Sequence, residues 1–246
     1  MGVSCLSHRP TSLQEQINDQ LQDAIPAVDI CRKLRIIQES ITPFVSWQNI
    51  HTKSKSKEVQ MITIIGISGS LRRHSFNSGL LRASAEAVPV GCSLKIGSIL
   101  DIPLYNADIE EERGIPSVVE DLKNQIASAD GLLMVTPENN NSMPGVFKNA
   151  IDWLTRPPED KARIFGNLPV GLMGATPGSF GTAFSQYAWL PVLRVLGAQV
   201  WSGRLMWVSG AMSKFDKEGN LTDDEVRKQL TKYMSGFTDF VSRMKA

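Results

Sequence analysis

Residues 62–77 read ITIIGISGSLRRHSFN, and they combine a strand, a turn and the start of a helix. The run Ile62–Ile67 is rich in β-branched residues, which favour strands. Serine and glycine dominate the residues that follow, and a helical pattern begins at Asn77. A strand that passes through a short turn into a helix is the first half of a βαβ unit. The segment therefore predicts the opening of an α/β domain.

The same alternation continues to the end of the chain. Further strands are expected at Ser93–Ile99, Gly131–Thr136, Val170–Ala175 and Gln199–Gly203. Helices are expected at Asn77–Ala87, Ser117–Ala129, Gly145–Leu154, Thr182–Leu196 and Thr222–Met244, the last capped by Thr222. This order predicts a doubly wound, five-stranded parallel sheet with helices on both faces. Ligands in such folds bind beyond the carboxyl ends of the strands.

The chain upstream of this domain differs in composition. The charged run Lys53–Glu58 has no apolar face to bury, so we place the boundary there, with an N-terminal extension at 1–60 and the domain at 61–246. Apolar residues at near-helical spacing between Leu13 and Ile37 predict at most weak helices. The extension is either a docking or targeting segment or a disordered leader, and we favour the leader.

Composition argues against several classes of protein. The formal net charge of +1 lacks the basic excess of nucleic-acid binders and the acidic excess of many small electron carriers. Apolar runs are too short for a membrane span. The cysteines Cys5, Cys31 and Cys92 show no CxxC or Cys/His spacing, so we expect neither a disulfide framework nor a metal site. The N-terminus also lacks the apolar core of a secretory signal, and a cytoplasmic protein is therefore expected.

The turn after the first strand has chemistry suited to phosphate. Backbone N–H groups and the dipole at a helix N-terminus attract anions, while serine hydroxyls and Arg72 add donors and a countercharge. The Lys-Ser/Thr pair of a Walker loop is missing. The same residues also fit a plain Ser/Gly turn with Asn77 as the helix N-cap. We interpret His74 as a surface group beside the phosphate rather than as a base.

Two later turns can present backbone groups to a flat ring. The third strand leads into Thr136–Gly145, a rigid loop with two prolines and several asparagines. The fourth strand leads into Ala175–Thr182, whose small residues let the backbone approach a ligand closely. Each segment also fits an ordinary turn before a helix, because Asn, Pro and Gly are common turn residues.

Together, the phosphate turn and the loop after the third strand resemble the NADPH-dependent FMN reductase family of the flavodoxin-like superfamily, which includes chromate, quinone and azo reductases. The matching motifs are GSLR-x-x-S-x-N, Ile102–Asn106, Ala129–Gly131, PE-x-N-x-S-x-PG and Lys148–Trp153. The resemblance covers residues 61–245 and leaves out residues 1–60. It implies a flavodoxin-like fold, noncovalent FMN, NADPH as electron donor, and a homodimer or homotetramer whose subunit contacts help to shape the flavin pocket.

The resemblance also implies roles for individual residues. The FMN phosphate would be held by Ser68, Ser70, Arg72, Ser75 and Asn77, with Leu71 and Phe76 in the same motif. The ring would be lined by Pro137, Glu138, Asn139, Asn140 and Ser142, and completed by Thr176, Gly178, Ser179 and Gly181. The family usually has aromatic residues where this chain has Asn139 and Asn141. We therefore expect FMN to be retained with an altered reduction potential, affinity or acceptor preference.

The activity implied by the resemblance is NAD(P)H-dependent FMN oxidoreduction. Electrons would pass by ping-pong hydride transfer from NADPH through FMN to a small acceptor such as a quinone, chromate, an azo compound or free flavin. Because the hard chemistry belongs to the cofactor and no Ser/His/Asp or Cys/His set is recognisable, we predict no catalytic side chain. The alternatives are a flavodoxin-type electron carrier and a flavin-free sensing or interaction protein.

Overall fold

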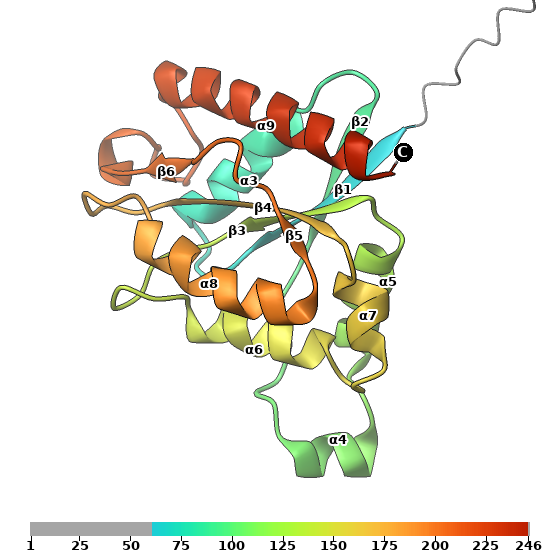
Figure 1. Ribbon diagram of the computed structural model, residues 1–246. Helices are drawn as coiled ribbons and strands as arrows, with labels where there is room; N and C mark the ends of the chain where they lie inside the picture. The colour runs from blue at the N-terminus through green and yellow to red at the C-terminus, as the bar shows by residue number, and fades with distance from the viewer. Residues whose placement is uncertain (1–60, 246) are drawn as a thin grey trace, which may run out of the picture. The chain divides into compact units, whose positions relative to one another are not determined.

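The computed structural model describes residues 61–245, and the predicted extension at residues 1–60 lies outside the described part of the chain. A parallel sheet forms its centre, with the strand order β2-β1-β3-β4-β5 and a further strand, β6, beside β4 (Figure 1). The strands are β1 (Ile62–Ser68), β2 (Cys92–Gly97), β3 (Gly131–Val135), β4 (Pro169–Ala175), β5 (Gln199–Val200) and β6 (Trp207–Val208). The predicted parallel α/β fold is confirmed.

Helices cover both faces of this sheet. The pair α3 (Phe76–Glu86) and α9 (Asp224–Lys245) lies over one face, and α5, α6, α7 and α8 lie over the other (Figure 1). The remaining bounds are α4 (Ala107–Arg113), α5 (Ser117–Ala127), α6 (Gly145–Leu154), α7 (Asp160–Phe165), α8 (Ala183–Leu196) and the 3₁₀ helix η1 (Ala211–Ser213).

Side chains alternate between the two faces of the sheet along each strand, and they therefore form two separate hydrophobic cores. Ile64 and Leu133 point to the α3 and α9 side, whereas Ile65 and Leu132 point to the opposite side. Consecutive side chains of a strand lie on opposite faces, so a strand covered on both faces is apolar at every position. This explains why β3 and β4 are buried throughout and why their sequences show no alternation.

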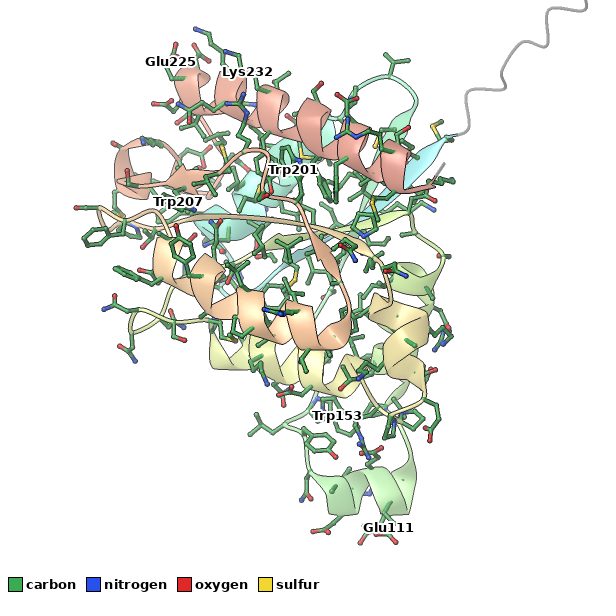
Figure 2. All side chains as sticks on the ribbon, in the orientation of Figure 1. Glu111, Trp153, Trp201, Trp207, Glu225 and Lys232 are labelled. Carbon is green, nitrogen blue, oxygen red and sulfur yellow. The ribbon has the colours of Figure 1, made fainter. Side chains whose placement is uncertain are left out.

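The edge of the sheet beside β4 differs from the prediction of one strand at Gln199–Gly203. β5 ends at Val200, the chain leaves the sheet, and β6 then pairs with the last two residues of β4. The excursion lets Trp201 pack against α9, with its ring centroid 4.8 Å from that of Tyr233 (Figure 2). The half-buried Trp201 side chain thus packs on α9 at the point where the edge strand is interrupted.

Two predicted helix starts are also corrected. Asp223, and not Thr222, caps α9, because its carboxylate oxygen accepts a hydrogen bond from the Val226 N–H at 2.8 Å. The Thr222 hydroxyl instead donates to the Lys214 carbonyl oxygen at 3.2 Å. Helix α3 is capped by Ser75 rather than Asn77. Local sequence does not discriminate between neighbouring capping residues when several are present.

The short helices α4 and α7 were not predicted. None of the residues of α4 is buried, so no apolar period marks this helix in the sequence. The segment that leads into α4 is held by α6, because the Pro103 carbonyl oxygen accepts hydrogen bonds from Asn149 Nδ2 and Trp153 Nε1, both at 2.8 Å. Asn149 Oδ1 also accepts from the Tyr105 N–H at 2.8 Å. Asn149 and Trp153 of the Lys148–Trp153 motif therefore hold the segment before α4 in place.

A buried lysine joins α5 to α7. The Lys123 side chain has no exposed surface, and its Nζ lies 2.7 Å from Glu120 and 2.6 Å from Asp160. It also donates to the Arg156 carbonyl oxygen at 2.8 Å. The hydrogen bond from Arg163, followed by that from Lys123, holds the pKa of Asp160 well below its usual range.

Asp160→Asn is expected to lower the free energy of unfolding by about 2–3 kcal/mol at pH 7, because it removes charge-assisted hydrogen bonds from a buried ammonium group. A lowered folded-state pKa stabilises the protein fully above the unfolded value, near 4, and this contribution is lost as pH falls through the folded value. The difference between the two proteins in urea denaturation should therefore shrink below about pH 4. Glu225→Gln, which breaks the exposed pair with Lys228, is the control, with an effect under about 0.5 kcal/mol. A pH-independent difference would contradict the assignment.

Candidate functional site

Three turns meet at the carboxyl ends of adjacent strands. They follow β1 (residues 68–75), β3 (136–144) and β4 (176–182), and we call them the first, second and third turns. Gly69 N–H donates to the Val135 carbonyl oxygen at 2.9 Å, and Thr136 N–H donates to the Met173 carbonyl oxygen at 2.8 Å. The chain order reverses between β1 and β3, which is the position at which such sheets bind ligands.

The first turn presents a row of free backbone donors. Ser75 caps α3, and its Oγ accepts hydrogen bonds from the N–H groups of Asn77 at 3.2 Å and Ser78 at 3.3 Å. Within residues 61–245, no acceptor is found for the N–H groups of Leu71, Arg73, His74, Ser75 and Phe76. Free N–H groups at a helix N-terminus form an anion site.

The hydroxyl groups of this turn are partly committed to one another. Ser68 Oγ accepts from Ser78 Oγ at 3.0 Å, and Ser70 Oγ accepts from the Arg72 N–H at 3.3 Å. Both acceptor hydroxyls keep a hydrogen that is available to a ligand. The Arg72 guanidinium is exposed, lies 4.9 Å from the Phe76 ring centroid and donates to the His74 carbonyl oxygen at 2.7 Å. The turn therefore combines donors with a positive charge.

Asn77 links the first turn to the third. Its side chain is buried, its Nδ2 donates to the Ala175 carbonyl oxygen at 2.8 Å, and its Oδ1 accepts from the Ala175 N–H at 2.9 Å. Both ends of the amide thus serve the backbone of β4. This places Asn77 as a connector between two turns, and its direct contact with phosphate stays a prediction.

Gly69 sets how closely the first turn approaches α6. A Cβ atom at this position would lie 2.2 Å from the Phe147 ring, which is fully buried and packs edge-on to Trp189. No side chain fits in that space. Close packing against Phe147 therefore explains why this chain has glycine at the first position of the GSLR motif.

The second turn is a tight hairpin. Asn139 and Ser142 exchange both backbone hydrogen bonds at 3.0 Å, and the two residues between them, Asn140 and Asn141, have φ of 51° and 58°. Positive φ at both central positions defines a type I′ turn, which favours Asn and Gly. The family usually has an aromatic residue at position 141. The positive φ of this position explains why an asparagine suits it in this chain.

Asn141→Tyr is expected to destabilise the protein by about 1–2 kcal/mol, because a bulky residue must adopt positive φ. Asn141→Gly keeps the turn and should stay within about 0.5 kcal/mol of the parent protein. Thermal and urea denaturation of the two variants measure the contrast. Equal stability of both variants would show that the turn does not have this conformation in solution.

The second turn is also anchored to α8. Glu138 Oε2 accepts from the Ser185 N–H at 3.1 Å, and Pro137 is half-buried. The buried hydroxyl of Thr136 lies 2.8 Å from Ser185 Oγ and accepts from Trp189 Nε1 at 3.1 Å. This Thr136 network was not predicted, because its members are far apart in the sequence and have no shared motif.

The third turn combines exposed backbone with a close contact. Gly178 and Ser179 are exposed, and Thr176 Oγ1 accepts from the Gly178 N–H at 3.4 Å. Gly181 has φ of 58°, and a Cβ atom there would lie 2.5 Å from the Trp207 backbone. The predicted residues of all three turns therefore lie at one end of the sheet, with Asn139, Asn140 and Leu71 exposed to solvent.

Family membership explains this arrangement. The model of the NADPH-dependent FMN reductases matches residues 62–212. The chain belongs to this family. It is 41% identical over 184 residues to an NAD(P)H-dependent FMN reductase of Pseudomonas aeruginosa, covering 75% of this chain and 97% of the relative. It is 37% identical over 180 residues to a 2-hydroxy-1,4-benzoquinone reductase of a Burkholderia species, covering 73% of this chain and 96% of the relative.

A solved structure supports the same assignment for this FMN reductase family member. The fold is similar to that of FerB, a flavoenzyme NAD(P)H:acceptor oxidoreductase from Paracoccus denitrificans, with a TM-score of 0.67 and 29% identity over 75% of this chain and 99% of FerB. The predicted resemblance, the flavodoxin-like fold and the oxidoreductase class are thereby confirmed.

Two structural features are absent from residues 61–245. None of the helices there combines the length and the apolar character that crossing a membrane requires. The same residues contain no group of three or more His, Cys, Asp or Glu side chains placed to bind a metal ion.

Proposed function

We propose that the three turns hold one noncovalent FMN, with its phosphate on the first turn and its ring between the second and third. The observation that carries this proposal is the row of free N–H groups beside Ser75 at the start of α3. A phosphate there would receive backbone hydrogen bonds, the Ser70 and Ser75 hydroxyls and the Arg72 charge. The exposed backbone of the Asn139–Ser142 hairpin and of Gly178 suits the polar edge of a flavin ring.

We also propose that the enzyme carries electrons from NADPH to a small acceptor in a ping-pong cycle. Bound FMN supplies a site that accepts a hydride and later releases two electrons. For a quinone, the balanced reaction is NADPH + H⁺ + quinone → NADP⁺ + hydroquinone. The protein positions the reactants, and none of its side chains is required as a proton donor. Chromate, azo compounds and free flavin are further acceptors in this proposal.

A direct assay tests this function. Purified protein should be yellow, should release FMN when denatured, and should oxidise NADPH in the presence of benzoquinone. Double-reciprocal plots of initial rate against NADPH concentration, measured at several fixed quinone concentrations, should give parallel lines. A colourless protein that takes up no FMN would refute the proposal. FMN binding without NADPH oxidation would instead indicate a flavodoxin-type carrier. A chain starting at Met61 should behave in the same way if residues 1–60 lie outside the catalytic unit.

We further propose that the enzyme is a homodimer, or a homotetramer built from such dimers, joined through the exposed side of α8. Apolar side chains gather there next to the third turn: Phe180, Phe184, Tyr187, Leu190 and Trp207. Phe180 and Phe184 are paired with ring centroids 5.2 Å apart, as are Tyr187 and Trp207 at 5.9 Å. A second copy seated on this surface would complete the wall of the ring site.

Sedimentation velocity tests the assembly. The parent protein should sediment as a dimer or tetramer, and Phe184→Glu should shift it toward the monomer because it places a charge in an apolar contact. Lys232→Glu on α9 is the control and should leave the assembly unchanged (Figure 2). A monomeric parent protein would refute the proposal. A cytoplasmic location is the final part of the proposal, and cell fractionation tests it.

A further inference from the structure

A groove lies beside the first turn, on the side of α3 that faces the chain after η1. It has a volume of about 420 Å³, which is within the range of sites for small ligands. Its lining comes from two separate segments, residues 72–76 and residues 212–217. The lining residues are Arg72, Arg73, His74, Phe76, Met212, Phe215, Asp216 and Lys217. We call it the adjacent groove.

The aromatic floor of the adjacent groove is the half-buried ring of Phe76, and the buried ring of Phe215 packs against it. The rings of Phe76 and Phe215 lie with centroids 5.2 Å apart and planes tilted by 44°. The Arg72 guanidinium lies over the Phe76 ring at 4.9 Å. Aromatic faces and a planar guanidinium are surfaces on which a purine base stacks.

The charge of the adjacent groove is positive. Arg72, Arg73 and Lys217 contribute three cations against the single carboxylate of Asp216. That carboxylate is directed to Asn220, accepting from its N–H at 2.7 Å and from its Nδ2 at 3.1 Å. Arg72 already serves the first turn, so Arg73 and Lys217 are the cations without a role in the FMN site. Two cations close to an aromatic floor suit a phosphate attached to a nucleoside.

The walls of the adjacent groove are held rigidly together. Gly219 has φ of 79°, and a Cβ atom there would lie 2.9 Å from the His74 backbone. A Cβ atom at Gly79 would lie 1.7 Å from the Gly219 carbonyl oxygen, so the backbones of α3 and of the 216–220 turn are in direct contact. Arg82 Nη2 adds a hydrogen bond to Asn220 Oδ1 at 2.8 Å. The groove is therefore built into the fold.

One of the two segments that line the adjacent groove follows directly from contacts with the third turn. Gly210 N–H donates to the Gly178 carbonyl oxygen at 3.2 Å, and Ala211 N–H donates to the Thr176 carbonyl oxygen at 3.0 Å. The segment that begins at these contacts runs on to Met212, Phe215 and Lys217. The backbone from Gly210 to Lys217 therefore joins the third turn to the groove.

We propose that the adjacent groove binds the 2′-phosphoadenosine end of NADPH and makes the enzyme prefer NADPH to NADH. This inference rests on the proposed function. The adenine would stack on the half-buried ring of Phe76, and the 2′-phosphate would pair with Arg73 and Lys217. NADH carries a hydroxyl group in place of that phosphate and leaves both cations without a partner, so the groove discriminates by charge.

The test compares Arg73→Ala/Lys217→Ala with the parent protein. The ratio of kcat/KM for NADPH to that for NADH should fall by about tenfold or more, since each cation makes a charge-assisted hydrogen bond in the proposed complex. The value for NADH and the FMN content should stay unchanged. Lys228→Ala/Lys232→Ala, on the exposed side of α9, removes the same charge elsewhere and should leave the ratio as it is.

Calorimetry gives a second readout that is independent of turnover. The FMN-loaded parent protein should bind adenosine 2′,5′-bisphosphate more tightly than 5′-AMP, and the groove variant should bind both equally. An unchanged kcat/KM ratio, or a parent protein without preference, would overturn the inference. Loss of FMN from the groove variant would also overturn it, because the cations would then belong to the FMN phosphate. Failure of the parent protein to hold FMN or to oxidise either nucleotide would count against the proposed function instead.

Discussion

Ser75→Asp is expected to abolish FMN binding while leaving the protein folded. Asp is as good an N-cap as Ser, so it should replace the hydrogen bonds that Ser75 accepts from Asn77 and Ser78. A carboxylate at the helix start also suits the helix dipole. The same carboxylate would repel the FMN phosphate by about 4 kcal/mol at 4 Å and an effective dielectric constant near 20. This is roughly a thousandfold loss in affinity.

Ser75→Asn is the matched control. Asn also caps helices well, and its side chain has nearly the same shape as that of Asp without the charge. FMN titration followed by fluorescence should show modest weakening for Ser75→Asn and no measurable binding for Ser75→Asp. Urea denaturation of the flavin-free proteins should place both variants within about 1 kcal/mol of the parent protein. Equal FMN affinity of the two variants would show that the phosphate lies elsewhere.

Asn77→Ala is expected to lower the free energy of unfolding by about 2–4 kcal/mol. It leaves the buried N–H and C=O groups of Ala175 without partners, and an unpaired buried polar group costs about 1–3 kcal/mol. FMN affinity should fall as well, because the amide holds the first and third turns together. Urea denaturation of the flavin-free protein measures the first effect, and FMN titration measures the second.

Two variants sharpen this prediction for Asn77. Asn77→Asp keeps an acceptor for the Ala175 N–H but sets a carboxylate against the Ala175 carbonyl oxygen, so it should also destabilise. Asn124→Ala, at an exposed position of α5, should change the free energy of unfolding by less than about 0.5 kcal/mol. An Asn77→Ala protein as stable as the parent would show that the link to β4 is not made in solution.

Much of the fold follows from local sequence. Apolar runs such as Ile62–Ile67 and the residues of β3 and β4 form buried strands because both of their faces are covered. Helices with a clear apolar period, such as α5 and α6, were predicted for the same reason. The short helices α4 and α7 lack that period, and they form where neighbouring elements supply hydrogen bonds and ion pairs.

Local sequence likewise predicts one part of the candidate site, and the tertiary structure decides the rest. Glycine, serine and arginine after the first strand predict an anion-binding turn, because such turns expose backbone donors whatever lies around them. The choice of Ser75 as the cap depends on the path of the backbone, and the positive φ of Asn140 and Asn141 appears only when the hairpin closes. These are properties of conformation, and several conformations are compatible with the same local residues.

By itself, the sequence determined the parallel α/β fold and the family, and it predicted that the turn after β1 binds phosphate. Apolar periodicity and short motifs express forces that act between near neighbours in the chain. Only the tertiary structure decided that Asn77 pairs with Ala175, that β5 and β6 are separate, and that residues 72–76 and 212–217 form one groove. Such contacts join residues far apart in the chain, and they depend on shape complementarity in the packed protein, which no local pattern encodes.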